Sequence, residues 1–134
     1  MVVNRERERA QVMADAITDS GNVVASPWVL DPYKRHDPSV LDVFDRDWQA
    51  VRGCDLVVAD ASRPSTGVGM EVMAAYFERK RIVVVAKRGS TVSGMLMHMR
   101  KKEFLEFDSD EDLYSSLRDL LEAGRINPSS GNQV

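Results

Sequence analysis

The chain has 134 residues, a net charge of −3 and a single cysteine. This length predicts one domain with one hydrophobic core, and one cysteine excludes an internal disulfide. The slightly acidic balance lacks the basic field of a nucleic-acid binder, so we expect no polynucleotide partner. No apolar run is long enough to span a bilayer, and the start has no secretory signal pattern. We therefore expect a cytoplasmic protein without a membrane partner.

The first third of the chain predicts two helices with a short strand between them. In chain order, we predict a helix over residues 5–19, a strand over 22–26, a loop over 27–35 and a helix over 37–52. Apolar residues recur about every 3.6 positions in both helices. Asp37 and Pro38 fit the N-cap and first position of the second helix. Only Met1-Val2-Val3 precede Asn4, which can cap the first helix, so we expect the first strand of the fold to be truncated or absent.

The rest of the chain alternates strands with helices. We predict a strand over residues 55–60, a loop over 61–69, a helix over 68–79, a strand over 82–86, a loop and short helix over 90–100, a strand over 104–107 and a helix over 110–123. Residues 1–126 then form the single domain, and residues 127–134, rich in Ser, Asn and Gly, form a flexible tail.

Alternating strands and helices predict an α/β fold, a three-layer sandwich around a mostly parallel sheet of the flavodoxin or Rossmann-like kind. In such sheets the active cleft lies beyond the carboxyl ends of the strands. The loops that follow Asp60 and Ala86 are therefore the places to look for function.

The loop after Asp60 carries the strongest local pattern. Ser65, Gly67 and Gly69 stand where this loop opens a helix, so hydroxyl and backbone N–H groups can bind an anion there. The glycines let a ligand approach the backbone closely, and we include Asp60 among the candidate substrate-binding residues. The spacing fits neither a Walker A loop nor the dinucleotide fingerprint. A plain strand-to-helix turn is the competing interpretation.

Two carboxylates are the catalytic candidates. Glu71 lies in the first turns of the predicted helix, where it either stabilises the helix dipole or acts as a nucleophile on an anomeric carbon. Asp47 lies along the apolar side of its own helix, where an acid is either paired with a nearby Arg or functional. Two carboxylates that lie close together can hold different protonation states.

Other side chains are weaker candidates. We interpret Ser93 as a helix N-cap and His98 as a packing or interface residue. Trp28 and Tyr33 could stack on a base or pack in the hydrophobic core. Cys54 reads as a small buried residue. No spacing of residues predicts a metal site.

Several of these residues belong to a pattern that is fairly specific as a whole. It consists of Arg46-Asp47-Trp48, the apolar run Cys54 to Asp60, and Pro64-Ser65-Thr66-Gly67-Val68-Gly69-Met70-Glu71. The pattern resembles the nucleoside 2-deoxyribosyltransferase superfamily, and looks closest to its 2′-deoxynucleoside 5′-phosphate N-hydrolases. The resemblance covers about residues 5–107. The chain departs from it in lacking the first Gly-Ser-Ile type loop, and in having Met70 where many relatives have Tyr.

The resemblance implies an activity and a role for each residue. Glu71 would attack C1′ to form a covalent glycosyl–Glu intermediate, and Asp47 would assist protonation of the leaving base. Ser65 would bind the 5′-phosphate, and Ser93 would complete the phosphate site of a neighbouring subunit in a homodimer. The implied reaction hydrolyses the N-glycosidic bond of deoxynucleoside monophosphates and needs neither metal nor cofactor.

Two other functions stay open at this point. A deoxyribosyltransferase would pass the same intermediate to a second base, although Thr66 after Ser65, in place of an acidic residue, favours a phosphate and so the hydrolase. A non-catalytic nucleotide-binding module is the third candidate, and the short start of the chain motivates it.

Overall fold

The computed structural model describes residues 1–3, 7–30 and 42–124, and their centre is a parallel sheet. Its strands, in both chain order and spatial order, are β1 (Val2–Val3), β2 (Leu56–Asp60), β3 (Arg81–Lys87) and β4 (Glu103–Phe107). Every neighbouring pair is parallel. The predicted parallel sheet is confirmed, and the described part of its first strand is two residues long.

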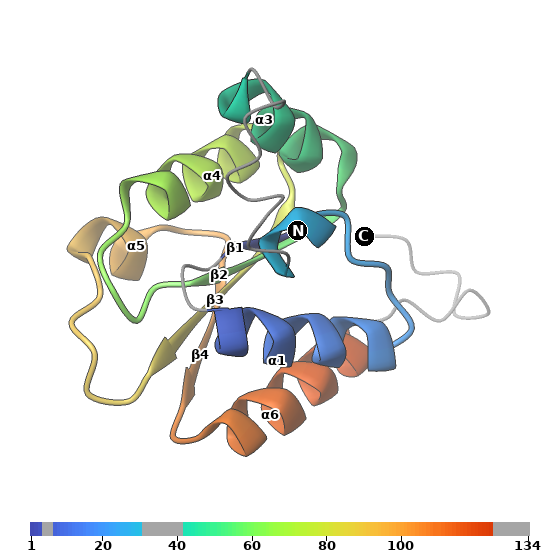
Figure 1. The fold of residues 1–134 in the computed structure, drawn as a ribbon. Helices are drawn as coiled ribbons and strands as arrows, with labels where there is room; N and C mark the ends of the chain where they lie inside the picture. Colours follow the sequence, from blue (N-terminus) through green and yellow to red (C-terminus); the bar gives the residue numbers. More distant parts are fainter. Residues whose placement is uncertain (4–6, 31–41, 125–134) are drawn as a thin grey trace, which may run out of the picture.

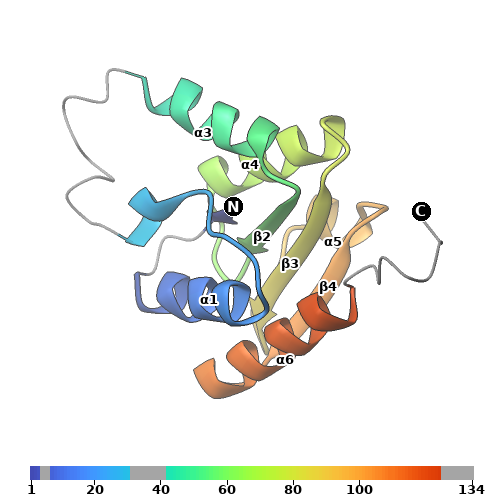
Figure 2. The same ribbon diagram turned by 90° about the vertical axis from the view of Figure 1, so that its right-hand side faces the viewer.

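Helices cover both faces of the sheet (Figures 1 and 2). They are α1 (Arg7–Asp19), α3 (Val43–Gly53), α4 (Thr66–Phe77), α5 (Gly94–His98) and α6 (Asp110–Ala123), with a 3₁₀ turn η1 (Pro27–Leu30). The pair α1 and α6 packs on one face, and the pair α3 and α4 packs on the other. This arrangement is the predicted three-layer sandwich. Within the described ranges, no helix is long and apolar enough to cross a membrane.

Strand β2 separates the two halves of the core. Val57 and Ala59 pack toward α3 and α4, whereas Val58 packs toward α1 and α6. Successive side chains of a strand point to opposite faces, so a strand covered on both faces needs apolar residues at consecutive positions. Asp60 is next in this alternation and lies on the α1 side of the sheet.

Asp60 anchors α1 to the carboxyl ends of two strands. Its side chain is nearly buried, and Oδ2 accepts a hydrogen bond from Arg9 Nη1 at 2.9 Å. The backbone N–H and hydroxyl of Ser62 donate to Oδ1 at 2.9 and 2.6 Å. The N–H of Lys87, at the end of β3, donates in turn to the Ser62 hydroxyl oxygen at 2.9 Å. These hydrogen bonds connect the loop after β2 to α1 and to the end of β3.

Charged side chains also join β3 to β4. Arg81 donates from Nε and Nη2 to the two carboxylate oxygens of Glu103 at 2.7 and 2.8 Å. Arg88 donates to Glu106 and to Asp108, each at 2.6 Å. In the described sheet, β1 and β4 are the outer strands, and β4 carries two glutamates.

One predicted element of the first third is wrong, and another begins later than predicted. Residues 22–26 form no strand, and Val23 is 89% exposed. A strand needs a neighbour for its ladder bonds, and no strand of the described sheet pairs with residues 22–26. The second helix begins at Val43, because Asp42 is its N-cap and accepts a hydrogen bond from Asp45 N at 3.0 Å. The predicted start at Asp37 and Pro38, and the predicted tail over 127–134, lie outside the described residues.

We predict that Asp60→Ala lowers the free energy of unfolding by about 3–5 kcal/mol, because it removes one partner of a buried ion pair. Urea denaturation measures the loss. Asp55→Ala, an exposed carboxylate just before β2, is the matched control and should stay within about 0.5 kcal/mol of the parent. Equal midpoints for the two variants would contradict the anchoring role.

Candidate functional site

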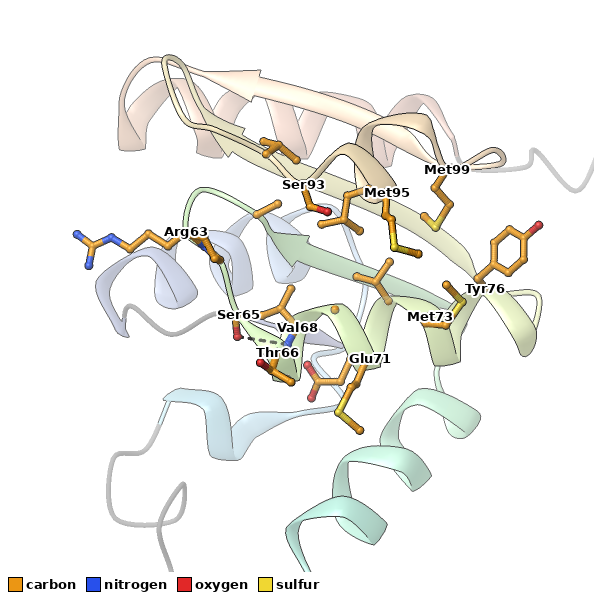
Figure 3. A pocket seen from close by; sticks show the side chains of 18 of the residues that line it. Arg63, Ser65, Thr66, Val68, Glu71, Met73, Tyr76, Ser93, Met95 and Met99 are labelled. Atoms are coloured by element: carbon orange, nitrogen blue, oxygen red, sulfur yellow. Dashed lines mark hydrogen bonds between the residues drawn. The ribbon is translucent and has the colours of Figure 1, made fainter.

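A cavity of about 1520 Å³ opens at the carboxyl ends of β2 and β3 (Figure 3). The loop after β2 and the first turns of α4 form one wall, and the loop after β3 with α5 forms another. Trp28 of η1 and Arg46 and Asp47 of α3 also line it. The cavity thus lies at the two loops where the sequence places the cleft. It is larger than the roughly 300–1,000 Å³ of typical small-molecule pockets.

The start of α4 presents polar groups to this cavity. Ser65 is the N-cap, and its Oγ accepts a long hydrogen bond from Val68 N at 3.4 Å. The first helical backbone bond runs from Gly69 N to Ser65 O at 3.1 Å. The N–H groups of Thr66 and Gly67 precede it and have no intrahelical acceptor, as at every helix start. These groups and the Ser65 hydroxyl can donate to an anion.

The glycines at this helix start are not required by packing. A Cβ built on Gly67 or Gly69 would have no atom within 4 Å, and neither residue has the positive φ that favours glycine. Glycine inside a helix costs roughly 0.5–1 kcal/mol relative to alanine. Both glycines line the cavity, so the open space above them is the space a ligand would fill.

The two candidate carboxylates line the same cavity. Glu71 is half-buried on α4, and Figure 3 shows it on the first turns of that helix with Ser65 and Thr66. Asp47 lines the cavity from α3, and its Oδ1 accepts a hydrogen bond from Arg46 Nε at 2.8 Å. The pairing of Asp47 with a nearby Arg is therefore observed, together with its place in the cavity wall.

Ser93 lies at the opposite wall of the cavity. It is the N-cap of α5, as expected, but its side chain makes no capping hydrogen bond. The residue is exposed, and Figure 3 shows it across from the start of α4. His98, at the end of α5, is exposed and lines the cavity as well. It therefore does not pack in the core of this chain.

Asp60 is the one residue among the catalytic and substrate-binding candidates that the cavity does not include, and Tyr33 lies outside the described residues. The strand alternation turns its side chain to the α1 face, where Arg9 and Ser62 engage both carboxylate oxygens. We assign it to support of the loop. Cys54 is buried and donates from Sγ to Val51 O at 3.2 Å, which confirms it as a small core residue. Among the described residues, no group of three or more His, Cys, Asp or Glu side chains could hold a metal ion.

Sequence reasoning missed two parts of the site. One is the contact between Arg46 and Trp28, whose ring centroid lies 4.9 Å from the guanidinium carbon. The other is an apolar extension of the cavity between α4 and α5, lined by Met73, Tyr76, Met95 and Met99. The spacing of Met70 and Met73, three apart on one helix, was a signal in the sequence for this second part. The structure shows that both side chains are exposed.

The fold is shared with a nucleotide-acting enzyme. A CMP N-glycosidase of Clostridium botulinum superposes with a TM-score of 0.65 over 87% of this chain and 95% of its own, at 18% sequence identity. At that identity the likeness establishes the fold alone.

Two curated proteins are similar in sequence, and both are named "putative 2′-deoxynucleoside 5′-phosphate N-hydrolase 1". The one from Syntrophotalea carbinolica is 33% identical over 64% of this chain and 62% of its own length. The one from Thermofilum pendens is 28% identical over 69% and 67%. The match thus spans a little under two thirds of the first relative. No family model matches the chain. The resemblance inferred from the sequence is confirmed by these relatives.

We predict that Gly67→Ala keeps or slightly raises stability, by up to about 1 kcal/mol, and lowers turnover, because a methyl group would enter the space that the ligand needs. Thermal unfolding and base-release assays measure the two effects. Gly53→Ala is the matched control, since Gly53 also has open space around it but lies outside the cavity wall, and it should retain full activity. Full activity in Gly67→Ala would show that no ligand approaches this backbone.

Proposed function

We propose that this protein hydrolyses the N-glycosidic bond of 2′-deoxynucleoside 5′-monophosphates, releasing free base and deoxyribose 5-phosphate. The observation that carries the proposal is that Glu71 and Asp47 both line the cavity at the start of α4. The names of the two curated relatives support the same reaction, and the fold is that of an N-glycosidase. We also propose that the protein acts in the cytoplasm.

The reaction proceeds in two displacements. The Glu71 carboxylate attacks C1′, the C–N bond breaks, and its electron pair leaves with the base, which takes up a proton with the help of Asp47. A water molecule then attacks C1′ of the glycosyl–Glu71 ester, loses a proton and releases deoxyribose 5-phosphate. A carboxylate suits this role because the sugar ring carries positive charge in the transition state.

The substrate phosphate binds at the start of α4 in this proposal. The Ser65 hydroxyl and the first backbone N–H groups donate to it, and the positive end of the helix dipole favours its charge. Because the Val68 N–H reaches Ser65 at 3.4 Å only, this hydroxyl can reorient toward a phosphate at little cost. An anion held here fixes the sugar near Glu71, two helical turns or less along the same element.

A homodimer completes the proposed site. Exposed apolar side chains gather on α4 and α5, and they are Met70, Met73, Tyr76, Phe77, Met95 and Met97. A patch of this kind is typical of an interaction surface. Ser93 lies beside it with a hydroxyl that makes no capping bond, so an interface here would allow Ser93 to reach the phosphate of the neighbouring subunit.

We expect Glu71→Gln to abolish release of free base from deoxynucleoside monophosphates, because the neutral amide cannot act as the nucleophile. Chromatography of the base after long incubation measures this. Glu78→Gln, at the C-cap of the same helix, is the matched control and should leave turnover unchanged. Unchanged base release in Glu71→Gln would remove Glu71 from the mechanism, and base exchange without net hydrolysis would select the transferase.

A mixing experiment tests the shared site. Glu71→Gln and Ser93→Ala subunits should each be nearly inactive alone. In a mixed dimer one site carries both defects and the other carries neither, so co-refolding equal amounts should restore about a quarter of the parent activity. Activity that stays at the level of the two separate variants would show that Ser93 acts in its own chain or not at all.

A further inference from the structure

A chain of three side chains from two separate elements ends at the Asp47 carboxylate. The Trp28 ring, on η1, lies 4.9 Å from the guanidinium carbon of Arg46. Arg46 Nε then donates to Asp47 Oδ1 at 2.8 Å. Asp47 Oδ2 has no hydrogen-bond partner among the residues that the structure describes, so it is available to a substrate or a water molecule.

Helix geometry alone does not bring Arg46 and Asp47 together. Consecutive residues on an α-helix point about 100° apart and do not face each other. Arg46 must therefore fold back along α3 to reach its neighbour, and an aromatic ring is suited to hold a guanidinium in such a position. The side chains of Arg46 and Asp47 are only 18% and 23% exposed, so bulk water screens the pair weakly.

We propose that Trp28 and Arg46 are positioning residues that fix the orientation of Asp47 in the cavity. The indole of Trp28 holds the guanidinium, and the guanidinium holds one carboxylate oxygen so that the other faces the reacting groups. This inference rests on the proposed function for its kinetic consequence, but the arrangement itself can be tested without turnover.

Kinetics test the arrangement through its effect on the chemical step. Trp28→Leu and Arg46→Met should each lower kcat by about tenfold or more, because a misplacement of about 1 Å can cost about 100-fold, and should change KM by less than about twofold. Trp28→Phe, which keeps an aromatic face, should restore most of kcat. Arg52→Met, on the same helix with an exposed ion pair to Glu78, is the control and should keep the parent kcat.

Combined variants distinguish positioning from a general loss of structure. Once Asp47 is replaced by Asn, adding Trp28→Leu or Arg46→Met should have little further effect on kcat, because the two residues act through Asp47. Multiplying effects in these double variants would overturn the proposal. So would an increase in KM with kcat unchanged, which would indicate that Trp28 or Arg46 binds the substrate directly.

A crystal structure of Trp28→Leu tests the same arrangement if the parent protein releases no base. The Asp47 carboxylate should adopt another rotamer in this variant and keep its position in Arg52→Met. An unchanged Asp47 in Trp28→Leu would overturn the inference. Absence of base release from the parent would count against the proposed function alone.

Discussion

The alternation of side chains along β2 determines where every part of the site lies. Val57 and Ala59 point to the layer of α3 and α4, and Val58 and Asp60 point to the layer of α1 and α6. Because the strand is buried on both faces, a shift of one residue would exchange these two sets, and the side chains would no longer fit the helix layers that they face. The same register that buries the valines places the Asp60 side chain against α1. The start of α4 lies on the other side of the loop, beside the cavity.

The site combines a rigid base with an incomplete helix end. The loop between β2 and α4 is tied to α1 and β3 through Asp60 and Ser62, so the first turn of α4 has a fixed position. Its donors, however, are those that every helix leaves unpaired. A ligand with negative charge would supply the acceptors that the helix start lacks, so few charged side chains would be needed to bind it there.

Much of the fold was predictable because buried parallel strands and amphipathic helices leave strong local patterns. The apolar run 55–60 predicted a strand of the sheet, and the Gly-bearing loop after Asp60 predicted the place of the cavity. The error over 22–26 arose because strand formation depends on a neighbour that local sequence does not reveal. The contact of Trp28 with Arg46 is likewise tertiary and has no periodic signature. The orientation of Asp60 could have been derived from the period of two, since Val58 and Asp60 share a face.

The outer strands of the described sheet offer little to an added strand. An unpaired strand edge is a template for adding foreign strands, but β1 offers only two residues for such pairing. On the other side, β4 carries Glu103 and Glu106 in ion pairs with arginines of β3 and of the turn after it. Charge on an edge strand discourages its pairing with a strand of another chain. In the described part of the chain, the sheet edges are therefore poor templates for backbone pairing, whereas exposed apolar side chains gather on α4 and α5.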